Sequence, residues 1–205
     1  MKGFILSVKN AKNEDTIVTI LSSKSSQSYY RFFGARHSII SLGFLIDFEV
    51  EGEDSRFLPR LRRVSHLSFD WLKNNSKLLL WHQFITILEP HLRDIEELDE
   101  FYFNLLLEAS SKWGRQNPKR VAVESYIKLL LFEGRVHFNN ECYICQTPLE
   151  QFVGLMAGFK MCHPQCIYSP SLLKTSIIEL FQTQTTIKLN DKEVDYLFDV
   201  ILKGI

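Results

Sequence analysis

Long hydrophobic runs are missing from this sequence. Its longest apolar runs are short segments such as LLLW and LLLF. A bilayer-spanning helix needs about 18 apolar residues, so the sequence predicts no membrane span and no membrane partner. The apolar start, MKGFILSVKN, is also too short for a signal peptide. We therefore expect a cytoplasmic protein, in which clustered cysteines favour metal binding over disulfides.

An excess of charge of either sign is also missing, because 24 Lys and Arg balance 24 Asp and Glu. The balance is not uniform along the chain. Residues 1–66 carry ten basic and seven acidic side chains, whereas residues 67–205 carry fourteen and seventeen. This mild asymmetry permits a basic face on the N-terminal part but does not establish one.

Signatures of catalysis are missing as well. The sequence contains no phosphate-binding G-x-x-x-x-G-K-[ST] or G-x-G-x-x-G loop, no G-x-S-x-G nucleophile turn and no H-E-x-x-H metal motif. These absences lower the expectation of an enzyme, and we predict that the protein has no catalytic residues.

The first third of the chain has the alternating pattern of β-strands. Phe44, Ile46, Phe48 and Val50 alternate with acidic residues in FLIDFEVEGED, the clearest example. Five short strand candidates in about 65 residues indicate a small barrel, for which the OB-fold is the commonest architecture. These candidates are GFILSVKN, DTIVTILSS, SYYRFFGAR, FLIDFEVEGED and RFLPRLRRVSHLSF.

Beyond residue 70 the apolar spacing becomes helical. Asn117-Pro118 is a typical helix start, and Asn190 with Glu193 has the spacing of a capping box. The predicted fold class is α+β: an N-terminal five-stranded OB-fold barrel, then an α-helical domain with an inserted zinc knuckle. We place the barrel, as a DNA-binding domain, at 1–66, the helical domain at 67–205 and the insertion at about 138–168.

All four cysteines lie within 25 residues, in CYICQTPLEQFVGLMAGFKMCHPQC. Structural zinc takes four Cys or His ligands, and this segment offers five. Cys142, Cys145 and Cys166 fit any arrangement. The fourth ligand is Cys162, favoured by thiolate affinity, or His163, favoured by its regular spacing to Cys166. Because a full ligand set leaves no open position, we expect a structural Zn²⁺ rather than a reactive one.

Two segments mix basic and aromatic residues, as surfaces that bind single-stranded nucleic acid do. The segment YYRFFGAR places Tyr29, Tyr30, Phe32 and Phe33 among Arg31 and Arg36. The segment RFLPRLRR holds four arginines in eight residues. The alternative is that the aromatics fill the barrel and the arginines pair with nearby carboxylates. The predicted DNA contacts are Tyr29, Tyr30, Arg31, Arg36, Arg60, Arg62 and Arg63, with Arg56 in the same run.

Several of these stretches together resemble the bacterial RecO family of recombination mediators. GAR at 34–36, followed by LIDFEVE and LPRLRRVSHLSF, is similar to the end of the family's OB-fold. ESYIKLLLFEGRVHFNNECYIC and GLMAGFKMCHPQC are similar to its two zinc arms. The chain departs from the family in its shorter length and in the C-H-P-Q-C second arm.

The resemblance implies a non-enzymatic role in DNA repair. RecO-like proteins bind single- and double-stranded DNA and anneal complementary strands. They engage RecR and the C-terminal tail of single-stranded DNA-binding protein, and so help RecA indirectly. The resemblance assigns much of the DNA surface and the RecR contact to the barrel, here through Arg36 and the arginines at 60, 62 and 63.

Overall fold

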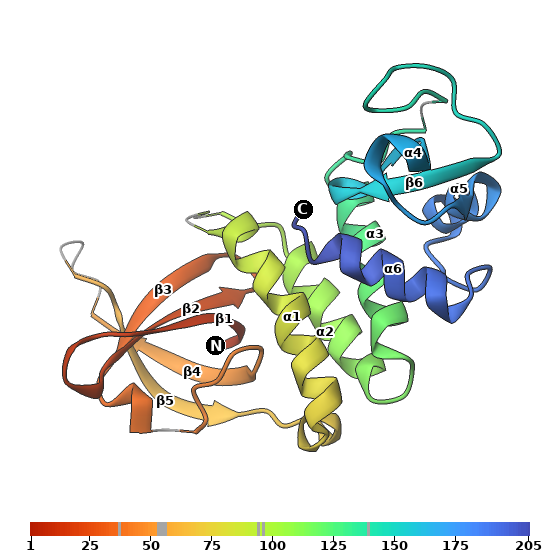
Figure 1. Ribbon diagram of the computed structural model, residues 1–205. Coiled ribbons are helices and arrows are strands. Elements are labelled where there is room, and N and C mark those ends of the chain that lie inside the picture. Colours follow the sequence, from red (N-terminus) through yellow and green to blue (C-terminus); the bar gives the residue numbers. More distant parts are fainter. Residues whose placement is uncertain (37, 53–56, 94, 96, 139) are drawn as a thin grey trace. The chain divides into compact units, whose positions relative to one another are not determined.

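The computed structural model describes residues 1–36, 38–52, 57–93, 95, 97–138 and 140–205 (Figure 1). The chain forms two compact units, Met1–Arg115 and Gln116–Ile205. The first unit holds five strands and two long helices, and the second holds the remaining helices with a small sheet.

The N-terminal strands close into a barrel in the order β1-β2-β3-β5-β4 (Figure 1). Neighbouring strands pair antiparallel, except that β3 and β5 pair in parallel at Tyr30 and Arg60. The prediction of a five-stranded barrel followed by helices is confirmed. The strands are β1 (Lys2–Asn10), β2 (Thr16–Ser22), β3 (Ser26–Arg31), β4 (Leu45–Glu51) and β5 (Arg60–His66).

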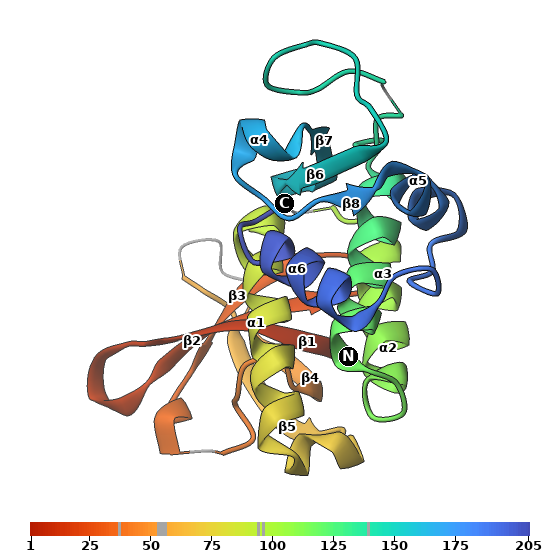
Figure 2. The same cartoon turned by 45° about the vertical axis from the view of Figure 1, so that its right-hand side comes forward.

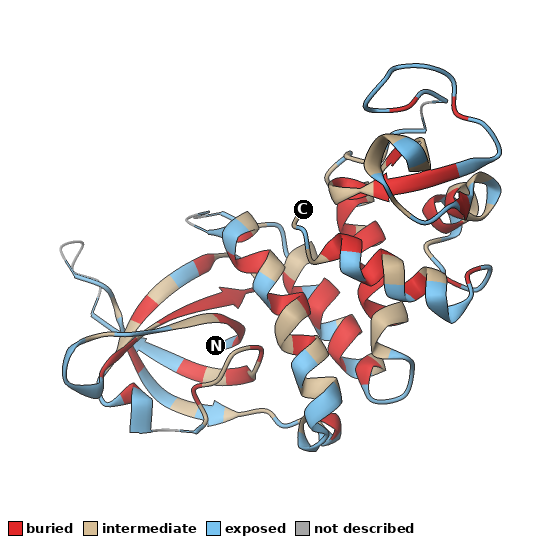
Figure 3. Ribbon diagram, in the orientation of Figure 1, coloured by how far each residue is buried: buried red, intermediate tan, exposed pale blue. Residues whose placement is uncertain are grey.

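Side chains fill the barrel interior from all five strands. Ile5, Val18, Ile46, Phe48 and Leu61 are each no more than 1% exposed. Strands β1 and β2 bury their outer faces too, because helices α1 (Asn75–Leu92) and α2 (Phe101–Trp113) pack there (Figure 3). The double burial explains why these two strands are almost continuously hydrophobic rather than alternating.

Three tryptophans, which are all the tryptophans of the chain, tie the helices of the first unit together. The Trp81 ring lies 5.3 Å from that of Trp71 and 4.9 Å from that of Trp113. Each indole N–H donates to a backbone carbonyl; that of Trp81, for example, donates to Gly43 at 2.9 Å. This cluster keeps α1 and α2 with the barrel. The compact unit therefore extends to Arg115, beyond the change from strands to helices at residue 66.

Local signals set the helix ends. Asn74 caps α1 by accepting the Lys77 N–H at 3.1 Å, and Pro90 falls in the last turn of that helix. Helix α2 ends before Gly114, as its sequence predicts. Among the described residues, no helix is both long and apolar enough to cross a bilayer.

The second unit packs α3 against α6, with a three-stranded sheet in the order β7-β6-β8. Helix α4 lies beside β6, and β8 leads into α5 (Figure 2). The predicted caps are present at Asn117 and in the capping box of Asn190 with Glu193. The elements are α3 (Pro118–Phe132), β6 (Phe152–Met156), β7 (Lys160–Cys162), α4 (Pro164–Ile167), β8 (Leu172–Leu173), α5 (Lys174–Thr183) and α6 (Asp191–Ile201).

Candidate metal centre and candidate nucleic-acid interface

Four side chains of the second unit converge on one point. The ligand atoms of Cys142, Cys145, His163 and Cys166 all lie within 4.8 Å of one another. His163 Nδ1 is 3.3 Å from the Sγ of Cys145 and 3.9 Å from that of Cys166. The ligands of a tetrahedral zinc ion are separated by roughly 3.5–3.8 Å, from its bond lengths. This group can therefore hold a metal ion.

A tight turn brings the first two cysteines together. The Cys142 N–H donates to the Thr147 carbonyl at 2.9 Å, and the Gln146 N–H donates to the Cys142 carbonyl at 2.9 Å. Gln146 takes a left-handed conformation, with φ of 60°, to close this turn. The second arm comes from β7 and α4, where the Cys166 N–H donates to the His163 carbonyl at 3.0 Å.

A backbone carbonyl orients the imidazole of His163. Its Nε2 lies 3.0 Å from the Pro148 carbonyl, so a proton on Nε2 leaves Nδ1 free to face the sulfurs. Metal-binding histidines commonly hold such a backbone carbonyl with their second nitrogen. The Pro148 carbonyl, followed by the Cys145 sulfur, raises the pKa of His163.

Cys162 is not one of these four donors, although its thiol interacts with Cys142. Its side chain is fully buried, and its thiol donates to the Lys160 carbonyl at 3.8 Å. Burial raises the pKa of Cys162 to about 11, with a further contribution from the charge of Cys142. Of the two alternatives for the fourth ligand, His163 belongs to the group of four donors within 4.8 Å, and Cys162 does not.

The three converging thiols differ in acidity. Burial opposes ionisation of Cys142, but hydrogen bonds from the backbone amides of Cys145, His163 and Ile144 outweigh it and lower its pKa to about 6. The Thr147 hydroxyl lowers the pKa of Cys145. Burial, and then the neighbouring cysteines, raise the pKa of Cys166 to about 11. A bound cation stabilises all three as thiolates, because metal ligation requires deprotonated sulfur.

The predicted arginines of the barrel are exposed but mostly paired. Arg62 Nε donates to Glu51 at 2.7 Å, and Arg63 donates to Glu49 at 3.2 Å. Arg36 pairs with Glu14. Among the described residues Arg60 forms no ion pair, although Glu51 lies opposite it in the ladder, and its guanidinium lies over the Phe32 ring. Arg56 lies outside the described residues.

A bulge in β5 exposes two consecutive arginines. The register between β4 and β5 shifts between Asp47 and Glu49, and Arg63 takes a φ of 43°. A bulge re-aims side chains that would otherwise alternate between faces. Arg62 and Arg63 are therefore both exposed, whereas Leu61 points into the barrel.

The other predicted contacts are less accessible. Tyr29 is only 2% exposed and packs edge-on against Phe48 in the barrel core. This burial corrects the expectation that Tyr29 offers its ring to a base. Arg31 is half-buried and donates to the Leu61 carbonyl at 2.9 Å; burial, and then the charge of Arg62, lower its pKa. Tyr30 is half-buried and donates to Asp15 at 2.5 Å.

Comparison with known families covers this barrel. Residues 1–72 match the family described as RecO N terminal. The barrel is therefore similar to the N-terminal domain of RecO proteins. The matched segment includes all five strands and stops before α1, and a search of curated proteins found no match for the chain.

The RecO-like barrel also exposes two aromatic residues that the predicted set of contacts leaves out. Phe32 is 39% and Phe33 is 51% exposed, just beyond the end of β3. The aromatic motif YYRFFGAR already indicated an exposed aromatic surface, but β3 ends at Arg31. Within the strand, side chains alternate between faces, so Tyr29 points into the barrel. Phe32 and Phe33 lie beyond the strand, where this alternation no longer applies.

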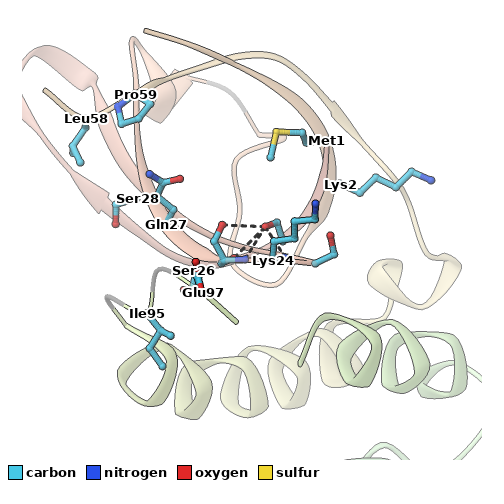
Figure 4. A pocket seen from close by; sticks show the side chains of 13 residues that line it. Met1, Lys2, Lys24, Ser26, Gln27, Ser28, Leu58, Pro59, Ile95 and Glu97 are labelled. Atoms are coloured by element: carbon cyan, nitrogen blue, oxygen red, sulfur yellow. Dashed lines mark hydrogen bonds between the residues drawn. The ribbon is translucent and has the colours of Figure 1, made fainter. Parts of the chain in front are cut away.

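A groove of about 910 Å³ opens elsewhere on the first unit (Figure 4). The turn between β2 and β3 supplies Lys24 and several serines to it, and Leu58, Pro59 and Ile95 supply apolar walls. Backbone hydrogen bonds hold its far wall, where the Leu98 N–H donates to the Lys24 carbonyl at 2.8 Å. Of the predicted DNA-contact residues that the structure describes, none lines this groove.

Proposed function

We propose that this RecO-like protein is a non-enzymatic recombination mediator in DNA repair. It binds single- and double-stranded DNA, anneals complementary strands and acts in the cytoplasm at the nucleoid. The observation that carries the proposal is the RecO N-terminal match over a closed barrel whose β5 strand exposes arginines at 60, 62 and 63. We take residues 1–66 as the DNA-binding part of the chain.

DNA phosphates can replace the carboxylates in the ion pairs of the barrel. Exposed pairs of this kind contribute about 0–1 kcal/mol each, and the side chains of Arg63 and Glu49 are 80% and 59% exposed. A phosphate group therefore displaces such a carboxylate at little cost. Each phosphate contact releases counterions from the DNA, which makes the binding salt-dependent.

Family resemblance supplies the partners. RecR contacts the barrel, and the C-terminal tail of single-stranded DNA-binding protein is bound as well. Together these contacts help RecA to load onto DNA that the single-strand binder covers. RecA itself is then an indirect partner.

We infer that Cys142, Cys145, His163 and Cys166 hold a structural Zn²⁺. Their convergence within 4.8 Å and the carbonyl behind His163 support this ligand set, with Cys162 as the alternative to His163. Zinc bound by four protein ligands has no position for water. It therefore links the two arms of the loop and does not activate a water molecule for catalysis. The ion stabilises a loop of polar residues, and its binding energy adds to folding energy.

Salt-dependent binding of a labelled single strand tests the proposal. Changing Arg60, Arg62 and Arg63 together to Gln removes three phosphate contacts. It should weaken binding and reduce the log–log salt slope by about two, at about 0.7 per contact. Fluorescence anisotropy between low and moderate salt measures both quantities. Lys188, Lys192 and Lys203, all exposed in the second unit, give a control with the same change of charge. An unchanged slope in the arginine variant would rule out this strand as the DNA surface.

A second candidate function is a zinc-stabilised adaptor that binds protein partners without DNA. The observation that favours it is the charge balance. The net charge is zero, and three of the predicted arginines already face carboxylates. Failure of the wild-type protein to bind any oligonucleotide at low salt would select this alternative.

A further inference from the structure

We propose that Phe32 and Phe33 form a platform on which the unpaired bases of single-stranded DNA stack, and that Asp15 positions it. The inference rests on the proposed function and names the substrate class that the barrel prefers. In this assignment the arginines hold phosphates, and the two rings distinguish an open strand from a duplex.

The backbone of Phe33 is strained. Its φ is 50°, in the left-handed region that bulky side chains rarely occupy. Its ring is nevertheless 51% exposed, so burial of the ring does not compensate for that strain. Strained residues that persist without a packing reason cluster at ligand-binding sites. The exposed ring on a strained backbone therefore makes Phe33 a candidate ligand contact.

Buried contacts hold Phe33 in this conformation. Asp15, only 6% exposed, accepts the Phe33 N–H at 2.7 Å and the Tyr30 hydroxyl at 2.5 Å. The next residue, Gly34, packs so closely that a Cβ there would lie 2.0 Å from Thr16 Oγ1. Buried contacts of Asp15 and Gly34 thus fix the turn that carries both rings.

Each ring lies beside a guanidinium group. The Arg60 Cζ is 5.1 Å from the centre of Phe32, and the Arg36 Cζ is 5.2 Å from that of Phe33. Tyr30 supports Phe32 edge-on at 5.1 Å. Exposed aromatic rings that each carry a guanidinium over one face match the two parts of a nucleotide, a planar base and an anionic phosphate.

Charge and exposure favour a nucleic acid over an apolar protein surface. A protein that covered both rings would also have to desolvate Arg36 and Arg60, whereas a DNA strand offers a phosphate to each. A duplex keeps its bases stacked inside and cannot offer them to the rings. The platform therefore contributes to binding of single strands and not of duplexes.

The test compares an oligothymidylate with an abasic strand of the same length and phosphate number. A stacked base contributes enough that its loss weakens binding about five- to 150-fold. We expect the wild-type protein to prefer the oligothymidylate by a factor in this range. Phe33→Gly removes one of the two rings, so it should reduce this preference and retain its duplex affinity and salt slope. Because glycine tolerates φ of 50°, this variant should melt no lower than the wild type.

Tyr168→Gly is the matched control. Tyr168 also has a φ of 50° and is 97% exposed, but it lies in the second unit. Its replacement relieves the same strain and removes an exposed ring, and should leave the base preference unchanged. Asp15→Asn should reduce the preference in the wild-type background and add nothing in the Phe33→Gly background, as expected of a residue that acts through Phe33.

The outcomes separate the two proposals. A wild-type protein that binds neither strand overturns the proposed function and the platform with it. Equal affinity for thymidylate and abasic strands, or full preference in Phe33→Gly, overturns the platform alone. An equal loss of duplex affinity in Phe33→Gly also contradicts it, because stacking requires unpaired bases.

Discussion

The arginine strand of the barrel and the cysteine cluster are both polar sites at the protein surface, but they differ in how their groups are satisfied. In the cluster, four donor atoms converge within 4.8 Å. Along β5, Arg62 and Arg63 pair with separate carboxylates, Arg62 with Glu51 at 2.7 Å, and Arg60 lies over the Phe32 ring. The site with the most reactive residues is therefore the one whose groups already face one another. Along β5, a ligand can replace the carboxylate partners of the exposed arginines.

Loss of the metal should produce the largest effect. Structural zinc contributes about 10–16 kcal/mol of apparent binding energy in zinc-finger peptides, far more than an exposed ion pair does. Cys142→Ser, or treatment with a strong chelator, should release the ion and unfold the segment around the two arms. Metal analysis and thermal unfolding measure these results. If chelation left the unfolding profile unchanged, the metal would not stabilise the fold.

Two further variants assign the fourth ligand in the same measurement. His163→Ala should lower the metal content because its Nδ1 faces the sulfurs. Cys162→Ser should retain the ion, because that thiol points to the Lys160 carbonyl. The reverse pattern would assign the fourth position to Cys162.

Gly34→Ala should give an intermediate effect on the barrel. The added Cβ would lie 2.0 Å from Thr16 Oγ1, and overpacking of this kind costs about 1–3 kcal/mol. Gly114→Ala is the control, because Gly114 has an ordinary φ of −77° and the added Cβ would come no nearer than 3.1 Å to Trp71. Denaturant unfolding should show the larger loss for Gly34→Ala. Equal losses would mean that the turn below Phe33 is not tightly packed.

Removal of the carboxylates opposite the arginines should have the smallest effect on stability. Glu49→Gln with Glu51→Gln breaks two exposed pairs and should change the free energy of unfolding by less than about 1 kcal/mol per pair. The same variant should bind single-stranded DNA more tightly, because phosphates no longer compete with these side chains. A weaker complex would show that the carboxylates take part in binding.

Much of the fold is predictable from local patterns. Alternation in β4, helical spacing beyond residue 70 and the caps at Asn117 and Asn190 all appear in the structure. Pairing across strands is not visible in a single sequence. The register of β4 with β5 decides that Arg62 meets Glu51, and neither segment contains that information alone.

The candidate sites were predictable in composition and less so in detail. The cysteine spacing indicates a metal group, but the choice between Cys162 and His163 depends on how β7 enters α4. The mixture of Tyr29 with Tyr30 indicates a surface, yet adjacent strand residues face opposite ways. Tyr29 consequently fills the barrel, and the exposed rings lie at Phe32 and Phe33, beyond the strand.

Strand annealing tests the central claim most directly. Complementary oligonucleotides are covered with single-stranded DNA-binding protein, and duplex formation is followed with and without the metal-loaded protein. We expect faster annealing that needs no nucleotide hydrolysis, rises with protein concentration and falls in the variant lacking Arg60, Arg62 and Arg63. No acceleration at any concentration, in a preparation that is folded and metal-loaded, would contradict it.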